Sequence, residues 1–424
     1  MGNLDLDKIQ GNVVPGFNKD HQAFVLVRFP GRDEARSWLA DLQPHLATAD
    51  DVNRFNALFS TLRDRALHPS EPDAGALNHV NATWVNVALS FGAIRMLVGA
   101  NAQTGMPMAF RQNRVPGVAL DAQLDAHALL IVAADQCDDL DAELGHQRER
   151  MATFGAADVR TLRGDTLPGA LRGHEHFGFK DSISQPRIAG TDWGCGADVA
   201  PGEFILGYPD QSGQTSGSTM PAWARNGSFV AFLQLQQHVA TFWSAMQQHA
   251  IQVGATSDEL AAWIVGRTKD GKKVSEPPGR ASHIGRAYSR WLGPTDALRH
   301  RIIRRGIPYG PAWAPGEPDG AHERGLFFVA YQADLERQFE HVWTQWLGAT
   351  NLPFPGSGTD ALVGQTSPLQ SSATMPWSAA TTRPTTVSRG GQTGGFSSVS
   401  LPSFVTPVCG GYFFSPAIGT TFTT

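Results

Sequence analysis

Blocks of apolar and polar residues divide the chain into short strands that are each followed by a helix. Residues 23–29 (AFVLVRF) form a short apolar run rich in β-branched and aromatic side chains, which predicts a buried strand. Pro30 and Gly31 then break the run. From residue 33 to residue 42, apolar side chains recur three and four positions apart, which predicts an amphipathic helix.

The same alternation continues through the first half of the chain. Residues 83–89 and 128–134 predict strands, and residues 91–97 predict a helix. A further strand is expected near 55–62. The resulting β-α-β-β-α-β order is that of the ferredoxin-like split βαβ unit.

The second half begins again in the same way. Residues 227–233 predict a strand and residues 237–246 a helix, and later residues 325–331 predict a strand and residues 334–347 a helix. Similar openings in both halves indicate a duplicated unit. The expected fold is therefore α+β, with two ferredoxin-like domains whose sheets are antiparallel.

Composition shifts set the expected domain boundaries. Residues 1–190 form the first domain, residues 191–226 a linker rich in Gly, Pro, Asp and Ser, and residues 227–424 the second domain. Within the second domain, residues 364–403 are rich in Ser, Thr, Gly and Pro and read as a surface excursion. The apolar stretch 410–414 is expected to dock back onto the body.

Charge and cysteine content narrow the function classes. The net charge is −5, whereas a nucleic-acid-binding protein usually has a basic excess, so no nucleic-acid partner is expected. The three cysteines, Cys137, Cys195 and Cys409, are far apart, so neither a disulfide framework nor a thiolate metal site is expected. A reducing compartment is the simplest inference.

The chain has neither a secretory signal pattern nor an apolar run long enough to cross a bilayer. We therefore expect a cytoplasmic protein with no membrane partner, although the pattern is also compatible with a secreted mature form. The sequence leaves open whether the protein forms a homo-oligomer.

Several polar residues could carry chemistry. His174 and His176 form a His-x-His pair, but no further ligand follows at a familiar zinc spacing. His283 follows a Pro-Pro-Gly break, Arg304 lies in a second loop, and Asp181 lies in the stretch GFKDSISQP. A histidine ligand, a cation and a carboxylate base would suit peroxide chemistry at a haem, but by themselves they do not define a reaction.

Taken in order along the chain, a set of short stretches resembles the dye-decolourising (DyP-type) haem peroxidases. The stretches are Asp7–Asn12, Glu175–Asp181 with Ile183–Pro186, Gly202–Tyr208, Asn226–Phe229, His283–Ile284, Arg301–Gly310, Glu323–Val329 and Gly410–Phe414. Each is weak alone, but the ordered set covers nearly the whole chain and is specific. The family's two ferredoxin-like domains also agree with the duplication.

The resemblance implies a function and a cofactor, haem b. The enzyme would use hydrogen peroxide to oxidise dyes, phenols or other one-electron donors through a ferryl intermediate. His283 would bind the iron, Asp181 would be the distal acid–base residue, and Arg304 would stabilise the charge that develops as the O–O bond breaks. Leu326 and Phe328 would form apolar walls of the haem pocket.

The loop around Asp181 would also contact the haem. It consists of Gly178, Phe179, Lys180, Ser182 and Ile183. In the family's Gly-x-x-Asp-Gly signature, Ser182 replaces the last glycine. Near His283, Gly285 replaces a usual arginine and Tyr288-Ser289 replace a usual Asn-Pro.

Two other functions stay open, and the departures at Ser182 and Gly285 would mark lost activity in the first of them. One is a haem-binding or haem-handling protein with little turnover, and the other is a ferredoxin-like scaffold without haem. Oxidation of a simple donor with peroxide separates the first from a peroxidase, and a Soret absorption band removes the second.

Overall fold

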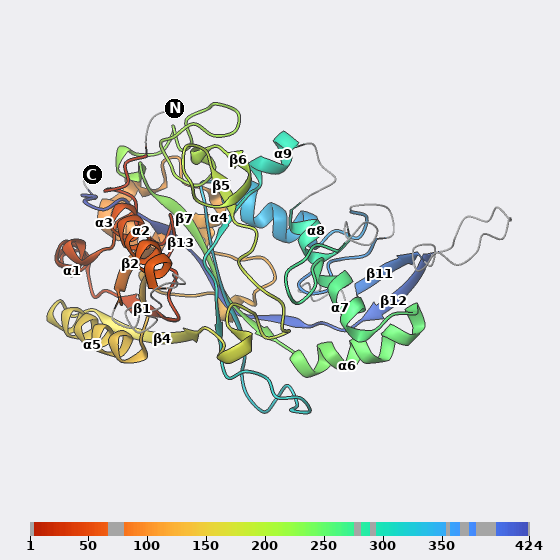
Figure 1. The fold of residues 1–424 in the computed structure, drawn as a ribbon. Coiled ribbons are helices and arrows are strands. Elements are labelled where there is room, and N and C mark those ends of the chain that lie inside the picture. Colours follow the sequence, from red (N-terminus) through yellow and green to blue (C-terminus); the bar gives the residue numbers. More distant parts are fainter. Residues whose placement is uncertain are drawn as a thin grey trace.

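The computed structural model describes residues 4–66, 80–274, 281–288, 294–352, 357–364, 373–378 and 396–422. Within these ranges the main feature is a sheet of nine strands in the order β4-β1-β3-β2-β13-β7-β10-β8, with β9 paired to β10 (Figure 1). The strands are β1 (His21–Arg28), β2 (Thr83–Leu89), β3 (Ala128–Ala134), β4 (Ala157–Asp165), β7 (Ser228–Gln237), β8 (Ile303–Arg304), β9 (Ile307–Tyr309), β10 (Gly325–Gln332) and β13 (Val405–Ser415).

The first half has the strand order and helices of a ferredoxin-like unit. Its four strands lie in the order β4-β1-β3-β2, and every pair among them is antiparallel. Helix α1 (Arg32–Leu42) follows β1 and helix α5 (Cys137–Thr153) follows β3. Helices α3 (Phe91–Val98) and α4 (Met108–Gln112) lie between β2 and β3. The predicted strands at 23–29, 83–89 and 128–134 are confirmed.

The prediction of a strand near residues 55–62 is wrong. These residues lie in helix α2 (Ala49–Ala66). Phe55 and Phe59 stack with ring centroids 6.3 Å apart, and Arg54 pairs with Asp50, so side chains four positions apart meet on one helix face. The aromatic residues that suggested a strand instead have helical spacing.

The second half repeats the arrangement of the first. Its strands lie in the order β13-β7-β10-β8, with helix α6 (Val239–Ala250) after β7 and helix η9 (Glu336–Leu347) after β10. The backbone of η9 is wider than an α-helix at its start, because Glu340 N donates to Leu335 O, five residues earlier. The α+β fold with two ferredoxin-like units is confirmed.

Strand β13 joins the two halves into one sheet. It pairs with β7 over most of its length and with β2 at Phe414, opposite Leu89. The apolar stretch 410–414 therefore lies within this sheet. The domain boundaries at 190 and 227 stay a prediction, because β13, from the end of the chain, lies between strands of both halves.

The inner faces of the two halves pack against each other through aromatic rings. Phe24 of β1 lies 5.1 Å from Phe232 of β7 and 5.4 Å from Phe327 of β10, measured between ring centroids. Side chains alternate along a strand, so Leu326 and Phe328 point to the other face of β10, toward helices. That outer face, rather than the shared aromatic core, borders the cavity described below.

Three further helices lie on the same side of the molecule as α6: α7 (Ser257–Val265), α8 (His283–Ala287) and α9 (Pro294–Arg299) (Figure 1). Strands β5 (Pro186–Ile188) and β6 (Cys195–Val199) form a small parallel sheet. Strands β11 (Ala373–Ser378) and β12 (Phe396–Leu401) form an antiparallel hairpin that projects from the body. Most of the predicted excursion at 364–403 lies outside the described residues.

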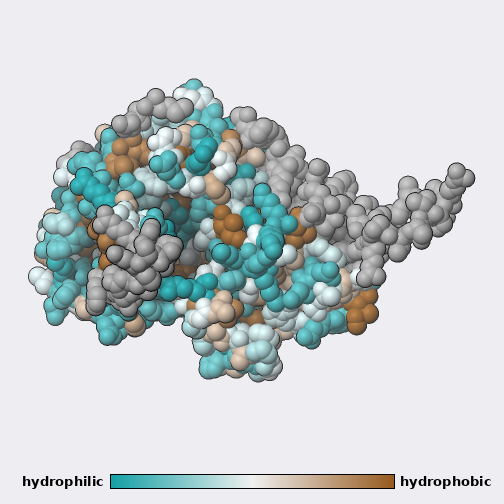
Figure 2. All heavy atoms as spheres, viewed as in Figure 1, coloured by the Kyte–Doolittle hydropathy of each residue, from teal (hydrophilic) through white to brown (hydrophobic). Residues whose placement is uncertain are grey.

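The face of the molecule in Figure 2 is mainly hydrophilic, with apolar residues in small separate groups. Among the described residues, no helix combines the length and the apolar character that crossing a bilayer requires.

Candidate active site

A large cavity lies between the outer face of β10 and the helices of the second half. Its lining comes from the loop 175–184, helix α8, strand β8, strand β10, helix η9 and residues 362–363. We call it the central cavity. It encloses about 1550 Å³, counting the space open to solvent at its mouth. Its apolar walls include Leu326, Phe328, Phe339, Val342 and Trp343.

Helix α8 brings His283 to the wall of this cavity. The helix begins at His283 because the Ser282 hydroxyl caps it and accepts a hydrogen bond from Gly285 N at 3.1 Å. The imidazole Nδ1 of His283 lies 3.2 Å from Asp360 Oδ1. In the described part of the chain, Nε2 has no hydrogen-bond partner, and its lone pair is available to a metal.

Asp360 is the partner of His283 that the sequence did not identify. Its side chain is completely buried, and Oδ1 also accepts hydrogen bonds from Leu362 N and Val363 N. Burial acts to raise the pKa of this carboxyl. The charge and hydrogen bond of His283, together with Val363 N–H and Arg286, outweigh burial, so the pKa is lowered. An ionised Asp360 holds the Nδ1 proton and so directs the Nε2 lone pair outward.

Arg286 fastens α8 to the segment that carries Asp360. Its guanidinium is fully buried and donates to the carbonyls of Ser357 and Gly358, at 3.0 and 2.8 Å. It also donates to Ala281 O within the same turn. Arg286 directly follows Gly285. The glycine in place of the usual arginine at position 285 therefore does not remove this buried guanidinium.

Asp181 and Arg304 meet in the same cavity. Arg304 Nη1 lies 3.8 Å from Asp181 Oδ1, and each side chain is about one-third exposed. The loop of Asp181 is tied to strand β8 by Gln185, whose amide accepts from Arg304 N at 3.1 Å and donates to Arg304 O at 2.9 Å. One glutamine therefore sets the position of the carboxylate relative to the guanidinium.

The backbone of the loop explains two of its unusual residues. Gly178 has φ +92° and Ser182 has φ +60°. The first angle belongs to a region that glycine adopts readily, and the second is left-handed and costs a serine roughly 1 kcal/mol. Ser182 N donates to the Asp181 carboxylate at 2.6 Å. Gly178 does not line the central cavity; its role is in the turn.

The other predicted loop and wall residues do line the cavity. They are Phe179, Lys180, Ser182, Ile183, Leu326 and Phe328. His176 lies elsewhere: it is buried, and its Nε2 donates to Tyr309 O at 2.8 Å. Burial lowers the pKa of His176 to about 4, so this ring is neutral at neutral pH.

Glu175 is a second carboxyl on the cavity wall. It accepts hydrogen bonds from Phe177 N and Phe179 N, both at 2.9 Å, and from the Gln237 amide. Desolvation raises its pKa to about 7 against the effect of these bonds, and the nearby charge of Asp181 adds to the rise. Glu175 closes the turn that precedes Asp181.

Tyr288, which stands where the family usually has Asn, holds the loop from the other side. Its hydroxyl donates to Ser184 O, and the Arg301 guanidinium lies 3.8 Å from its ring centroid. Arg267 donates to the Ser184 hydroxyl at 2.7 Å. The residue at 288 therefore supports the loop that carries Asp181.

These residues fit a haem. The cavity combines a wide apolar interior, an imidazole whose tautomer is set by a buried carboxylate, and a carboxylate–guanidinium pair. One oxygen of Asp360, Oδ2, is buried without a hydrogen-bond partner among the described residues.

Comparison with known proteins agrees with this geometry. Residues 210–371 match the family model described as "Dyp-type peroxidase, C-terminal". The chain is 28% identical to dye-decolorizing peroxidase msp1 of Mycetinis scorodonius, over 98% of this chain and 86% of that protein. It is 29% identical to a dye-decolorizing peroxidase of Auricularia auricula-judae, over the same shares of the two chains.

A solved structure of an ancestral D-type dye-decolorizing peroxidase superposes with a TM-score of 0.80, at 28% identity, over the whole of both chains. The chain belongs to the Dyp-type peroxidase family. As a Dyp-type peroxidase it is an oxidoreductase, which confirms the enzyme class inferred from the ordered stretches.

Sequence reasoning missed several residues of this Dyp-type peroxidase site. Asp360, Glu175, Gln185 and Arg286 were not singled out for a role. Glu175 and Gln185 lie within the stretches that resemble the family, so these stretches could have pointed to both residues. Asp360 lies 77 residues from His283, and no local pattern marks it.

Proposed function

We propose that this protein is a haem b peroxidase that reduces hydrogen peroxide and oxidises dyes, phenols or other one-electron donors. The observation that carries the proposal is one apolar cavity lined by His283, whose ring pairs with the buried Asp360 behind it, and by both members of the Asp181–Arg304 pair. The names of the curated relatives, which are dye-decolorizing peroxidases, support dyes as donors.

In the proposed mechanism, His283 Nε2 would hold the haem iron, and Asp360 would keep the proton on Nδ1. A bound haem would supply the redox chemistry, namely two-electron oxidation by peroxide and return in one-electron steps. The apolar side chains of β10 and η9 hold the ring and keep bulk water out.

Asp181 moves the proton. Ser182 N and Arg304 both contact Oδ1 of the Asp181 carboxylate, and neither of these contacts involves Oδ2. This oxygen would take a proton from one peroxide oxygen and return it to the other, which leaves as water. Arg304 would stabilise the negative charge on the leaving oxygen. Gln185 holds the Asp181 loop against the Arg304 backbone and so fixes the relative position of these two groups.

The test compares Asp181→Asn and Arg304→Leu with the wild-type holoenzyme. The measured quantity is the rate of the first change in the absorption spectrum after one equivalent of peroxide. Loss of the proton-transfer group should slow this step about 10²–10⁴-fold, and loss of the cation should slow it about 10²–10³-fold. An unchanged rate in Asp181→Asn would reject the acid–base role. As a control for the cofactor, His283→Ala should lose most of the Soret band.

A further inference from the structure

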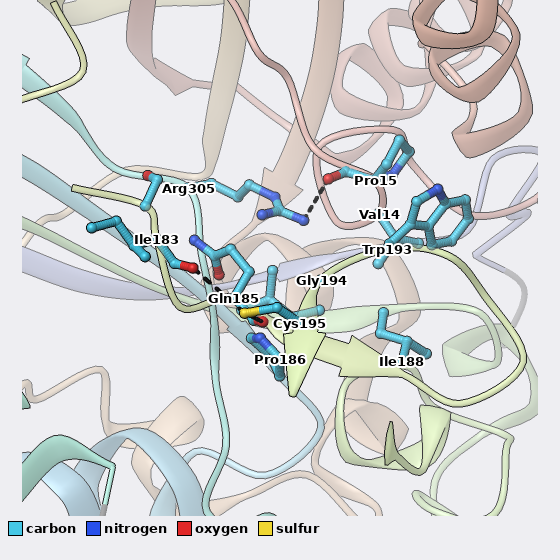
Figure 3. A pocket seen from close by; sticks show the side chains of 12 residues that line it. Val14, Pro15, Ile183, Gln185, Pro186, Ile188, Trp193, Gly194, Cys195 and Arg305 are labelled. Carbon is cyan, nitrogen blue, oxygen red and sulfur yellow. Dashed lines mark hydrogen bonds between the residues drawn. The ribbon is translucent and has the colours of Figure 1, made fainter. Parts of the chain in front are cut away.

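A second, smaller pocket lies on the far side of the loop that carries Asp181, and Figure 3 shows it from close by. We call it the outer pocket. Its twelve lining residues are Val14, Pro15, Ser182, Ile183, Gln185, Pro186, Ile188, Trp193, Gly194, Cys195, Ile303 and Arg305. It encloses about 630 Å³, counting open space, less than half the central cavity on the same measure. A single aromatic ring fits within this volume.

The outer pocket carries one positive charge. Arg305 is the only charged residue among the twelve. Its guanidinium donates to the carbonyls of Asn12, Val13, Pro15 and Arg304, at 2.7–3.2 Å. Within the part of the chain that the structure describes, no carboxylate lies within 4 Å of it. Burial lowers the pKa of Arg305 to about 10, so it stays protonated at neutral pH. Carbonyl dipoles solvate this charge without neutralising it.

The rest of the wall is apolar and includes an indole. Trp193 lies beside Val14 and Pro15 in Figure 3, and its Nε1 donates to Asn53 at 3.3 Å. Ile188 and Ile303 also line the pocket, and both side chains are buried. A flat ring can pack on such surfaces, and a negative substituent on it would meet the field of Arg305.

The outer pocket also touches the proposed peroxide site. Ser182 and Ile183 line both cavities, so a single loop separates them. Arg304, which lines the central cavity, and Arg305 are adjacent in the chain and point into different spaces. A donor in the outer pocket would therefore lie one loop away from the residues that act on peroxide.

We propose that the outer pocket binds a one-ring aromatic anion, a phenol that carries a sulfonate or carboxylate, as an electron donor. The inference rests on the peroxidase function proposed above. Each phenol loses one electron and its hydroxyl proton and becomes a phenoxyl radical. Two phenols and one hydrogen peroxide give two phenoxyl radicals and two waters, so atoms and electrons balance.

Cys195 provides a direct test of binding. It is exposed, it lines the pocket, and its Sγ lies 3.5 Å from the carbonyls of Ile183 and Gln185 (Figure 3). Cys137 is exposed but lies outside the pocket, and Cys409 is buried. In the Cys137→Ser holoenzyme, N-ethylmaleimide should therefore modify Cys195 selectively.

We expect 4-hydroxybenzenesulfonate at saturation to slow this modification at least 5-fold, whereas the neutral 4-hydroxybenzyl alcohol at the same concentration should not. In the Cys195→Ser holoenzyme, the sulfonate should leave modification of Cys137 unchanged. Absence of protection, or equal protection by both compounds, overturns the proposal whether or not the protein is a peroxidase.

The charge of Arg305 is tested separately. Arg305→Gln should abolish protection by the sulfonate, while Arg225→Gln, which removes an exposed arginine outside the pocket, should leave it intact. If Arg305→Gln does not fold, because the residue holds the segment 12–15, the salt dependence serves instead. Protection by the anion should weaken as ionic strength rises. If the sulfonate still protects Cys195 in Arg305→Gln and at high ionic strength, Arg305 is not the charge that binds it.

The donor role is tested by turnover. After Cys195 is blocked with N-ethylmaleimide, KM for the sulfonate should rise at least 5-fold, and kcat/KM for the neutral alcohol should stay unchanged. If the sulfonate protects Cys195, but the enzyme oxidises the sulfonate equally well after Cys195 is blocked, the donor role is overturned. If the unmodified enzyme oxidises neither compound, the peroxidase proposal fails while the binding result stands.

Discussion

At the scale of single residues, the site depends on side chains that set the state of their neighbours. Asp360 fixes the proton on His283, and Gln185 fixes the backbone of Arg304. Neither residue would touch peroxide. Each therefore acts as a positioning residue, and its loss should change the properties of the group that it holds.

Asp360→Asn tests this for the proximal side. An amide in place of the buried carboxylate removes the negative charge that makes the imidazole a strong ligand. Haem affinity should fall about 10–100-fold, the usual effect of losing such a partner. The measurement is haem titration followed by the Soret band, with the reduction potential as a second readout. An unchanged affinity and potential would show that Asp360 has only a packing role.

Glu175→Gln tests the half-buried carboxyl that closes the turn. Its pKa is about 7 in the fold and ordinarily 4.5. Between these pH values the unfolded chain releases a proton that the folded chain keeps, so rising pH favours unfolding. From pH 4.5 to 7, wild type should lose about 3 kcal/mol of unfolding free energy relative to the variant, at about 1.36 kcal/mol per pKa unit. Below and above this window the difference should stay constant. Denaturant titrations at several pH values measure it, and a difference independent of pH contradicts the prediction.

At the scale of elements, helix α7 depends on its first turn. The Thr256 hydroxyl accepts from Glu259 N, and the Glu259 carboxylate accepts from Thr256 N, which is a complete capping box. The helix packs its apolar residues Leu260, Ala261 and Ile264 into the core. It ends at Gly266, whose φ of +97° suits a glycine.

Thr256→Ala should therefore cost about 1 kcal/mol of unfolding free energy. The matched control is Thr61→Ala, because Thr61 lies exposed inside α2 and bonds only to Ala57 O in its own helix. Alanine has the higher helix propensity there, so this variant should be neutral or slightly stabilising. Urea unfolding of both variants gives the comparison. Equal effects of the two substitutions would remove the capping argument.

At the scale of the whole molecule, the halves share one sheet and one aromatic core. Phe24 belongs to the first half, and Phe232 and Phe327 belong to the second, yet their rings are in contact. Strand β13 adds backbone pairing to both halves. We expect the two units to unfold together although each has a ferredoxin-like strand order.

Phe327→Ala should lower the unfolding free energy by about 3–5 kcal/mol, because it removes a fully buried ring from this core. The loss should appear in a single transition that circular dichroism and tryptophan fluorescence report alike. Leu58→Ala is the control: Leu58 is 54% exposed, so its removal should change stability by less than about 0.5 kcal/mol. Two separate transitions, with one unmoved, would mean that the halves unfold independently.

Much of the fold could be predicted because its signals are local. The strands at 23–29, 83–89, 128–134, 227–233 and 325–331 are apolar runs, and their repetition indicated the duplication. The strand expected near 55–62 failed because Phe55 and Phe59 are also four residues apart, and that spacing suits a helix. Strand β4 was missed because it alternates only weakly, with most of its side chains partly or fully exposed.

By itself, the sequence determined the family and the two ferredoxin-like units, because short ordered stretches carry this information, and the same stretches predicted His283, Asp181 and Arg304 as site residues. Only the tertiary structure decided which residues act together. Asp360 reaches His283 across 77 positions, β13 joins the halves, and Arg304 and Arg305 line different cavities. These relations depend on distances between segments far apart in the chain, and local periodicity contains no record of such distances.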